Sequence, residues 1–383
     1  MLKEFWGQSM EIAIVRGKYL NQYEMQSFEP LAKKHHLVGF SSLRPFHDKF
    51  SFPVVKLPSP MDIPDFPFKM PILNRLFIDG QFLFGLEEKL RGFDICHSAE
   101  TYFGYTQQCL NAKKRGYVKK VVTTIWENTP FANEGIWGRK KFKERARREV
   151  DHFICVSKMA KEALLLEGCR EGKITVIPPG VDVKRFKPGP KNPWPKTRKV
   201  RVLFVGRLEF EKGACDFLFA AKGLVEDKDL ENYNLIFTMV GQGSLKRRLL
   251  VLEKRLGIKD KIIHKIVPYQ EMPREYRGAD IFVAPSKPSQ TWREQFSMVL
   301  LEAQASGLPI VTTYCGAIPE NVGKAALVVS PGEAVEIKEA IKKLILNPNL
   351  AKEIGLAAQK RAVGFFDAEE QARKIEKVYH SLL

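Results

Sequence analysis

The chain has 383 residues, of which 44% are hydrophobic and 28% charged, and its formal net charge is +18. This length exceeds what one hydrophobic core usually supports, so we expect two domains, and the composition excludes a globally disordered chain. The six cysteines are scattered without close pairs, which excludes a disulfide framework or a cysteine-ligated metal site and is typical of reduced thiols in a cytosolic protein.

No run approaches 18 apolar residues, and the stretch MLKEFWGQSMEIAIVRG lacks the apolar centre of a signal peptide. We therefore expect a cytoplasmic protein that can touch a membrane without spanning it. Basic residues concentrate at 111–120 and 138–148, with seven of them among 139–148. Such a face attracts nucleic acid, acidic lipid head groups or phosphate-bearing substrates, unless salt bridges on a solvated helix neutralise it.

Strand-like apolar runs alternate with helical patterns along the first half of the chain. The runs are continuous, which favours strands buried on both faces of a parallel sheet. Residues 1–190 are therefore predicted to form a Rossmann-like domain. Its predicted strands lie at 11–17, 36–42, 53–58, 93–98, 120–126, 152–157 and 174–180.

The proline-rich stretch KPGPKNPWPKTRK, at 187–199, has no periodicity and is predicted to be a linker. The pattern restarts in a second Rossmann-like domain at 199–366, and the amphipathic tail at 367–383 is predicted to be a helix that packs back on the first domain. We expect an α/β protein whose two doubly wound domains face each other across a cleft. The second set of strands is predicted at 199–208, 234–243, 261–268, 279–286, 308–314 and 325–331.

A phosphate-binding turn is predicted in VLFVGRLEFEKG, at 202–213. A buried strand ends at Gly206, and the cations Arg207 and Lys212 flank an acidic loop before a helix begins. Arginine binds phosphate oxygens bidentately, lysine adds a mobile charge, and a helix N-terminus attracts anions. The alternative is a loop whose two cations only pair with the neighbouring glutamates.

A second glycine turn lies in VGQGS, at 240–244. Gly241 and Gly243 allow a tight turn or a close backbone approach to a ligand. The spacing does not satisfy the complete dinucleotide-binding fingerprint, so this motif is weak evidence by itself.

Two acids in TWREQFSMVLLEAQASGLPIV are the most informative residues of the chain. Glu294 precedes a helix predicted at 296–306, and Glu302 lies inside it. At about 1.5 Å per residue, Glu302 lies roughly 8 Å along the axis from Ser297, on the order of the length of a sugar–pyrophosphate–ribose unit. A buried carboxylate needs partners, so Glu302 either binds a diol such as a ribose or pairs with a nearby cation. Free amides near Phe296 can face a phosphate or sugar oxygen.

Together these phrases resemble glycosyltransferase family 4, the retaining group 1 enzymes of GT-B fold. Glu294 and Glu302 resemble the E-x7-E motif of that family. Other phrases that resemble its segments, in the family's order over about 155–380, are VIPPGVDVKRFKP, FVGRLEFEKG, YRGADIFVAPS, EAQASGLPIV, GAIPENVG and FFDAEEQARKIEKVY. The first 150 residues match less sharply.

The resemblance implies transfer of a hexose from a nucleotide diphosphate sugar, of the GDP-mannose or UDP-glucose type, to a sugar, lipid-linked or other hydroxyl acceptor. It implies no metal and no cofactor beyond the donor. Arg207 and Lys212 would neutralise the leaving diphosphate, Glu302 would hold the ribose, and Glu294 would orient the donor sugar. The implied donor-site residues are Gly206, Arg207, Lys212, Gly241, Gly243, Glu294, Gln295, Phe296, Ser297 and Glu302.

The chain departs from the family pattern on both sides of the reaction. Ser297 and Ala317 stand where the family often has glycine, and TTIWENTPF places Trp126 or Glu127 where many members have a histidine. His97 is the nearest alternative histidine. The acceptor-side candidates are Gly17, Asn21, His97, Glu100, Trp126 and Glu127.

In such enzymes the acceptor domain often meets a membrane, so the basic segment 138–148 predicts peripheral association with an anionic surface, at the inner face of the plasma membrane. Two alternatives stay open: a GT-B relative with phosphorolytic or hydrolytic activity, and a basic nucleic-acid-binding protein. The second would need base-stacking aromatics amid the basic residues, where only Tyr117, Trp137 and Phe142 lie. We therefore expect no nucleic-acid partner.

Overall fold

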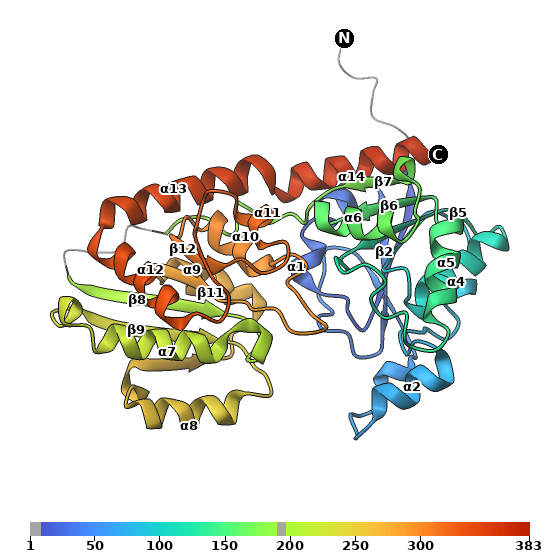
Figure 1. Ribbon diagram of the computed structural model, residues 1–383. Coiled ribbons are helices and arrows are strands. Elements are labelled where there is room, and N and C mark those ends of the chain that lie inside the picture. Colours follow the sequence, from blue (N-terminus) through green and yellow to red (C-terminus); the bar gives the residue numbers. More distant parts are fainter. Residues whose placement is uncertain (1–8, 190–196) are drawn as a thin grey trace, which may run out of the picture. The chain divides into compact units, whose positions relative to one another are not determined.

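The computed structural model describes residues 9–189 and 197–383, so the predicted linker lies largely outside the described residues. The chain divides into two compact units. Figure 1 colours the chain by residue number, from blue to red. Unit 1 comprises Met1–Gly180 with Ala368–Leu383, and unit 2 comprises Val181–Asp367. The assignment of an acceptor role to one domain and a donor role to the other stays a prediction.

Unit 1 is built on a seven-stranded parallel sheet in the order β3-β2-β1-β4-β5-β6-β7. Because the order reverses between β1 and β4, the carboxyl ends of these two strands flank the point where open α/β sheets bind ligands. The strands are β1 (Glu11–Gly17), β2 (His36–Ser42), β3 (Val54–Leu57), β4 (Phe93–Ala99), β5 (Val118–Ile125), β6 (His152–Cys155) and β7 (Ile174–Val176).

Helices cover both faces of this sheet, and the last one comes from the end of the chain. Ile375, Val378 and Tyr379 of that helix join a buried cluster with Ile12 and Ile14 of β1. The helices are α1 (Gln22–Met25), α2 (Lys69–Phe77), α3 (Leu86–Lys89), α4 (Gly104–Lys114), α5 (Arg139–Glu149), α6 (Lys158–Leu166) and α14 (Ala368–Leu382), with a 3₁₀ turn η1 (Glu29–Lys33).

Unit 2 repeats the architecture with a six-stranded parallel sheet in the order β10-β9-β8-β11-β12-β13, which reverses between β8 and β11. The strands are β8 (Lys199–Val205), β9 (Asn234–Val240), β10 (Ile262–Lys265), β11 (Ile281–Ala284), β12 (Ile310–Thr313) and β13 (Leu327–Val329). The helices are α7 (Ala214–Val225), α8 (Lys246–Leu256), α9 (Met272–Arg277), α10 (Met298–Ala305), α11 (Ile318–Val322), α12 (Ala334–Leu346) and α13 (Pro348–Phe365).

The predicted fold class is confirmed: both units are parallel-sheet α/β structures, and all the predicted strands form. Several of the helices, among them α2 and α13, had no predicted range. None of the helices in the described ranges combines the length and the hydropathy that a bilayer crossing requires.

Candidate functional site

The switch point of unit 2 brings a lysine and a glutamate together. Lys212 Nζ lies 2.7 Å from Glu294 Oε2, and Ser286 Oγ donates a hydrogen bond to the same oxygen at 2.9 Å. The Lys212 ammonium also lies 4.6 Å from the centre of the Trp292 ring. The buried carboxylate therefore fixes a cation beyond the carboxyl ends of β8 and β11, where an anionic ligand would bind.

Two glycines allow the backbone to pack this closely. Gly316 has φ +54°, and a Cβ there would lie 2.0 Å from the carbonyl oxygen of Glu294. Gly241 has φ +147°, and a Cβ there would lie 1.9 Å from the carbonyl oxygen of Gly206. Because no side chain fits at either position, the turns at Gly241 and Gly316 require glycine.

The two departures from the family pattern in this unit fit the backbone found here. Ser297 is the N-cap of α10 with φ −86°, so it does not need the freedom of glycine. Ala317 has φ −83°, and its amide donates to the carbonyl of Glu294 at 2.9 Å. Both residues therefore adopt a backbone conformation that does not require glycine.

Arg207 pairs with a different acid from the one that binds Lys212. Its Nη2 is 2.9 Å from Glu211 Oε1, and its side chain is 61% exposed. The pairing that the sequence offered as an alternative is thus present. An exposed pair of this kind is worth about 0–1 kcal/mol, so a phosphate could replace Glu211 at small cost.

Glu302 is buried in α10, and its partners are tyrosines rather than a cation. Tyr269 donates its hydroxyl to Oε1 at 2.8 Å, and Tyr276 donates to Oε2 at 2.7 Å. Burial raises the pKa of Glu302 to about 7. Each oxygen keeps a second lone pair for a ligand hydroxyl.

The residues that make these contacts were predicted to different extents. Tyr276 opens the phrase YRGADIFVAPS, which the family resemblance singled out, and Trp292 lies in the stretch TWREQFSMVLLEAQASGLPIV without a predicted role, whereas Tyr269 lies in no predicted motif. Two predicted donor-site residues have unequal burial: Gln295 is half-buried, and Phe296 is buried with its ring 5.9 Å from that of Phe366. The Phe296 side chain therefore belongs to the core.

The switch point of unit 1 carries a strained, buried acid. Glu100, directly after β4, has φ +56°, and its Oε1 accepts hydrogen bonds from the amides of Trp126 at 2.8 Å and Glu127 at 3.0 Å. Burial, and then the nearby Glu127, raise the pKa of Glu100 to about 8. Left-handed backbone at a non-glycine residue is costly and clusters at functional sites.

His97 has the environment of a core histidine. Its Nδ1 bonds to the Tyr379 hydroxyl, and its Nε2 lies 2.7 Å from Thr124 Oγ1. Burial holds the pKa of His97 well below its ordinary value, so the imidazole is neutral. Because both ring nitrogens have partners, His97 joins β4 to α14 and offers no nitrogen to a substrate.

The two remaining acceptor-side candidates shape the chain after β1. Asn21 caps α1: its Oδ1 accepts from the amide of Glu24 at 2.8 Å, and its Nδ2 donates to the carbonyl of Tyr19 at 2.7 Å. Gly17 has φ +54°, and a Cβ there would lie 3.0 Å from Gln81 Oε1. The contacts of Asn21 are therefore those of a local structural residue.

Helix α5 carries the basic segment, and internal pairs occupy most of its cations. Buried Arg139 lies 2.8 Å from Asp79, and buried Lys143 lies 2.6 Å from Glu167. The salt-bridged alternative thus accounts for much of the segment. The other cations are the ion-paired Arg145, Arg147 and Arg148 and the exposed Lys140 and Lys141.

A groove of about 890 Å³ lies where α4 and α5 end, and its cations cap these helices. Lys113 Nζ donates to the carbonyl of Glu149 at 3.1 Å and to Asp151 at 2.6 Å, and Lys173 Nζ donates to the carbonyl of Val150 at 2.8 Å. Lys113 and Lys173 therefore have a structural role at the ends of these helices.

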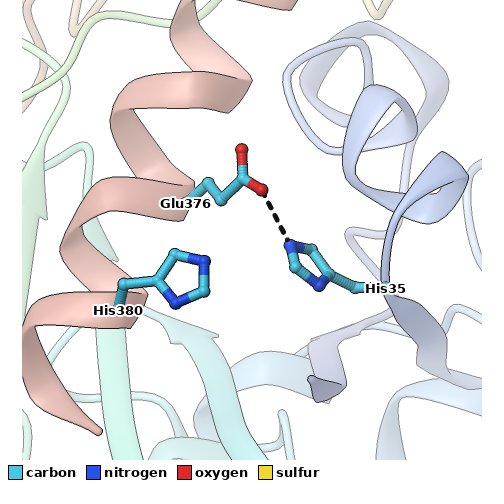
Figure 2. Close-up of side chains that lie close together, drawn as sticks. All are labelled: His35, Glu376 and His380. Carbon is cyan, nitrogen blue, oxygen red and sulfur yellow. Dashed lines mark hydrogen bonds and ion pairs between the residues drawn. The ribbon is translucent and has the colours of Figure 1, made fainter. Parts of the chain in front are cut away.

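Figure 2 shows a cluster of metal-ligating residue types in unit 1. Ligand atoms of His35, Glu376 and His380 lie within 4.8 Å of one another. However, His35 Nδ1 accepts from the amide of Met10 at 3.3 Å, so the neutral ring carries its proton on Nε2, which donates to Glu376 at 3.1 Å. Lys34 also lies 3.0 Å from Glu376. The cluster is therefore a polar contact between α14 and the η1 region, not a preformed metal centre.

Comparison with known proteins gives matches over both units. The model for glycosyl transferases group 1 matches residues 189–361, and the model for Glycosyltransferase Family 4 matches residues 34–185. A D-inositol 3-phosphate glycosyltransferase of Corynebacterium jeikeium is 32% identical over 224 residues, or 55% of this chain and 52% of the relative. The chain spans about half the length of the curated relatives that it matches first.

Two solved structures are similar over nearly the whole chain. The crystal structure of Anabaena HepE in complex with UDP has a TM-score of 0.75 and 17% identity over 97% of this chain and 100% of that chain. Sucrose-phosphate synthase of Thermosynechococcus elongatus has a TM-score of 0.75 and 19% identity over 97% and 98%. These similarities show the GT-B fold. With the two family models matching either half, the chain belongs to glycosyltransferase family 4, the group 1 glycosyltransferases.

Proposed function

We propose that this protein transfers a hexose from a nucleoside diphosphate sugar to a hydroxyl acceptor, with retention of anomeric configuration. The observation that carries the proposal is the Lys212–Glu294 pair at the switch point of unit 2, beside the two glycine turns. Anabaena HepE was crystallised with UDP and with UDP-glucose, so UDP-hexoses are the first donors to test, followed by GDP-mannose.

The donor-side chemistry follows from charge. Negative charge develops on the diphosphate as the glycosidic bond breaks, and the prepositioned ammonium of Lys212 stabilises it most at that point. Arg207 exchanges Glu211 for a phosphate oxygen. Glu294 orients the donor sugar, and Glu302, held by its two tyrosines, accepts hydrogen bonds from the ribose diol.

On the acceptor side, the half-buried Trp126 and Glu127 contact the incoming sugar or lipid-linked hydroxyl. Glu100 acts as a positioning residue because it binds both of their amides. At neutral pH its carboxyl is largely protonated, so it holds these amides without adding a second charge beside Glu127.

A thermal-shift screen with UDP-glucose, GDP-mannose and other nucleotide sugars tests the donor, because a ligand that binds only the folded state raises the melting temperature. Turnover with the best donor, followed by ¹H NMR of the product, tests retention. We expect Lys212→Ala to lower kcat/KM by about 10²–10³-fold. Lys222→Ala is the matched control, since the half-buried Lys222 pairs with Glu226 on α7.

Glu302→Gln is the informative change at the ribose site, because alanine would leave two buried tyrosine hydroxyls without an acceptor. We expect a higher KM for the donor with little change in kcat. Failure of every nucleotide sugar to raise the melting temperature or turn over, or full activity in Lys212→Ala, would refute the proposal.

A further inference from the structure

A third lysine lies against the predicted phosphate-binding turn of unit 2. Lys287 is the third residue after β11 and is half-buried. Its Nζ lies 2.7 Å from Oδ2 of the buried Asp216, a residue of α7. Within the described ranges, Lys287 is the one cation that forms an ion pair with Asp216. The pair therefore joins the segment after β11 to the start of α7.

Two further contacts hold Lys287 against the turn that precedes α7. Its ammonium lies 4.1 Å from the centre of the Phe210 ring, and its backbone amide donates to the carbonyl of Glu211 at 2.9 Å. Both partners belong to the 3₁₀ turn η4 (Phe210–Lys212). Lys287 therefore contacts the turn that carries Lys212 through its side chain and through its backbone.

The same two segments also touch through their backbones. Gly213, between η4 and α7, has φ +68°, and a Cβ there would lie 2.0 Å from the carbonyl oxygen of Pro285. Only glycine allows so close an approach. The next residue, Ser286, donates to Glu294, the acid that binds Lys212. The segment that carries Lys287 is therefore anchored at the start of α7.

The Asp216 carboxylate needs this partner because of where it lies. Asp216 is in the first turn of α7, four residues after Lys212. The helix dipole stabilises a negative charge there, but an unneutralised carboxylate would also repel a diphosphate that Arg207 and Lys212 bind. Such repulsion extends over about 10 Å at moderate salt and is stronger where the groups are partly buried. The ammonium of Lys287 neutralises the carboxylate and so removes the repulsion.

We propose that Lys287 is a positioning residue of the donor site. It neutralises Asp216 and holds the η4 turn, so that no unpaired carboxylate stands beside the diphosphate that Arg207 and Lys212 bind. Lys287 acts through these contacts and not on the donor, because Asp216 and the Phe210 ring already occupy its ammonium. The inference rests on the proposed function, since it assigns the pair to the diphosphate side of that donor site.

Calorimetric titration with UDP and with GDP tests the pair as a double-mutant cycle. We expect Lys287→Met to raise the Kd about 3- to 30-fold, because it leaves the carboxylate unneutralised. Asp216→Asn should bind at least as tightly as the wild type, because the freed lysine adds a cation. The double variant, which has neither charge, should lie within about threefold of the wild type. Lys222→Met, which removes the pair with Glu226 from the other end of α7, is the matched control and should leave the Kd unchanged.

Two readouts separate charge neutralisation from packing. Added salt screens the exposed part of the repulsion, so the ratio of the Kd of Lys287→Met to that of the wild type should fall as NaCl rises from about 0.05 M to 0.5 M. In turnover, Lys287→Met should raise the KM for the donor with little change in kcat, and Lys287→Arg, which keeps the charge, should restore most of the affinity. If the contact only packs the turn, both single variants bind more weakly, the double variant is no better, and the ratio does not change with salt.

The outcomes distinguish this inference from the proposed function. A wild type that binds neither nucleoside diphosphate nor any nucleotide sugar refutes both. A wild type that binds while Lys287→Met binds equally well, or a double variant that is as weak as Lys287→Met, overturns the inference alone. If Lys287→Met does not fold, Asp216→Asn decides the question, because weaker binding by that variant contradicts a neutralising role for Lys287.

Discussion

Two buried glutamates eight positions apart are satisfied in different ways, and the difference assigns them different chemistry. Glu294 pairs with Lys212 and accepts a hydrogen bond from Ser286, whereas Glu302 accepts from two tyrosines and has a pKa raised to about 7 by burial. Glu294 holds the Lys212 ammonium in a position where it can bind an anion. Glu302 is a hydrogen-bond acceptor whose position the two tyrosines fix. Sequence spacing predicted both acids but could not predict these partners, because they come from other elements.

At the residue scale, we predict that Trp292 positions Lys212. A cation–π contact is worth about 0.5–2 kcal/mol, so Trp292→Leu should lower kcat/KM for the donor about 2- to 30-fold. Trp292→Phe keeps an aromatic face and should recover most of the loss. Steady-state kinetics with the best donor from the thermal-shift screen would check this. If phenylalanine is as harmful as leucine, the ring acts through packing and the prediction is wrong.

At the element scale, elements whose burial matches a regular sequence pattern were predicted, and elements with an irregular pattern were not. The strands appear as continuous apolar runs because both faces of each sheet are buried, and such runs need no knowledge of distant partners. α2 was missed because its apolar residues also face solvent, so no polar face completes a helical pattern. α13 was missed although Asn347, whose side chain accepts from the amide of Leu350, and Pro348 form an ordinary helix start.

The same reasoning explains why sequence could not decide between the acceptor-side candidates. The strand ends that carry Glu100 and Trp126 were identifiable, but the burial of His97 depends on Tyr379, which lies on the last helix. The same holds for the basic segment 138–148. Arg139 and Lys143 are buried because they pair with Asp79 and Glu167, which lie on other elements. Such pairings are set by tertiary contacts rather than by local pattern.

Helix α14 should be as important to unit 1 as a strand of its sheet. Ile375 is 3% exposed within the cluster that contains β1, so Ile375→Ala should lower the free energy of unfolding of unit 1 by about 2–4 kcal/mol. Hydrogen exchange should quicken in β1 and β4 and stay unchanged in the strands of unit 2. Lys377→Ala, at an exposed position of the same helix, is the control. Equal acceleration in both units would contradict the division of the chain.

At the scale of the whole molecule, each unit carries a buried acid whose ionisation opposes folding. The pKa of Glu100 rises from 4.5 to about 8, and that of Glu302 from 4.5 to about 7. Between pH 4.5 and the raised pKa of each acid, the folded chain binds more protons than the unfolded chain. The contribution of each acid to the free energy of unfolding therefore falls as the pH rises through this range. His97 acts oppositely: its lowered pKa gives stability at neutral pH that is lost as the pH falls.

Replacing each acid by glutamine isolates its contribution, because the histidines cancel in the comparison with the wild type. A pKa change of one corresponds to about 1.4 kcal/mol, so we expect Glu100→Gln to gain about 2–4 kcal/mol relative to the wild type between pH 5 and pH 9, and Glu302→Gln about 1–3 kcal/mol. Glutamine keeps an oxygen for the amides that Glu100 binds. Because the two acids belong to separate cores, hydrogen exchange should place the first gain in unit 1 and the second in unit 2. A gain that does not change with pH, or one spread over both units, would mean that burial of these carboxyls is not what sets the pH dependence.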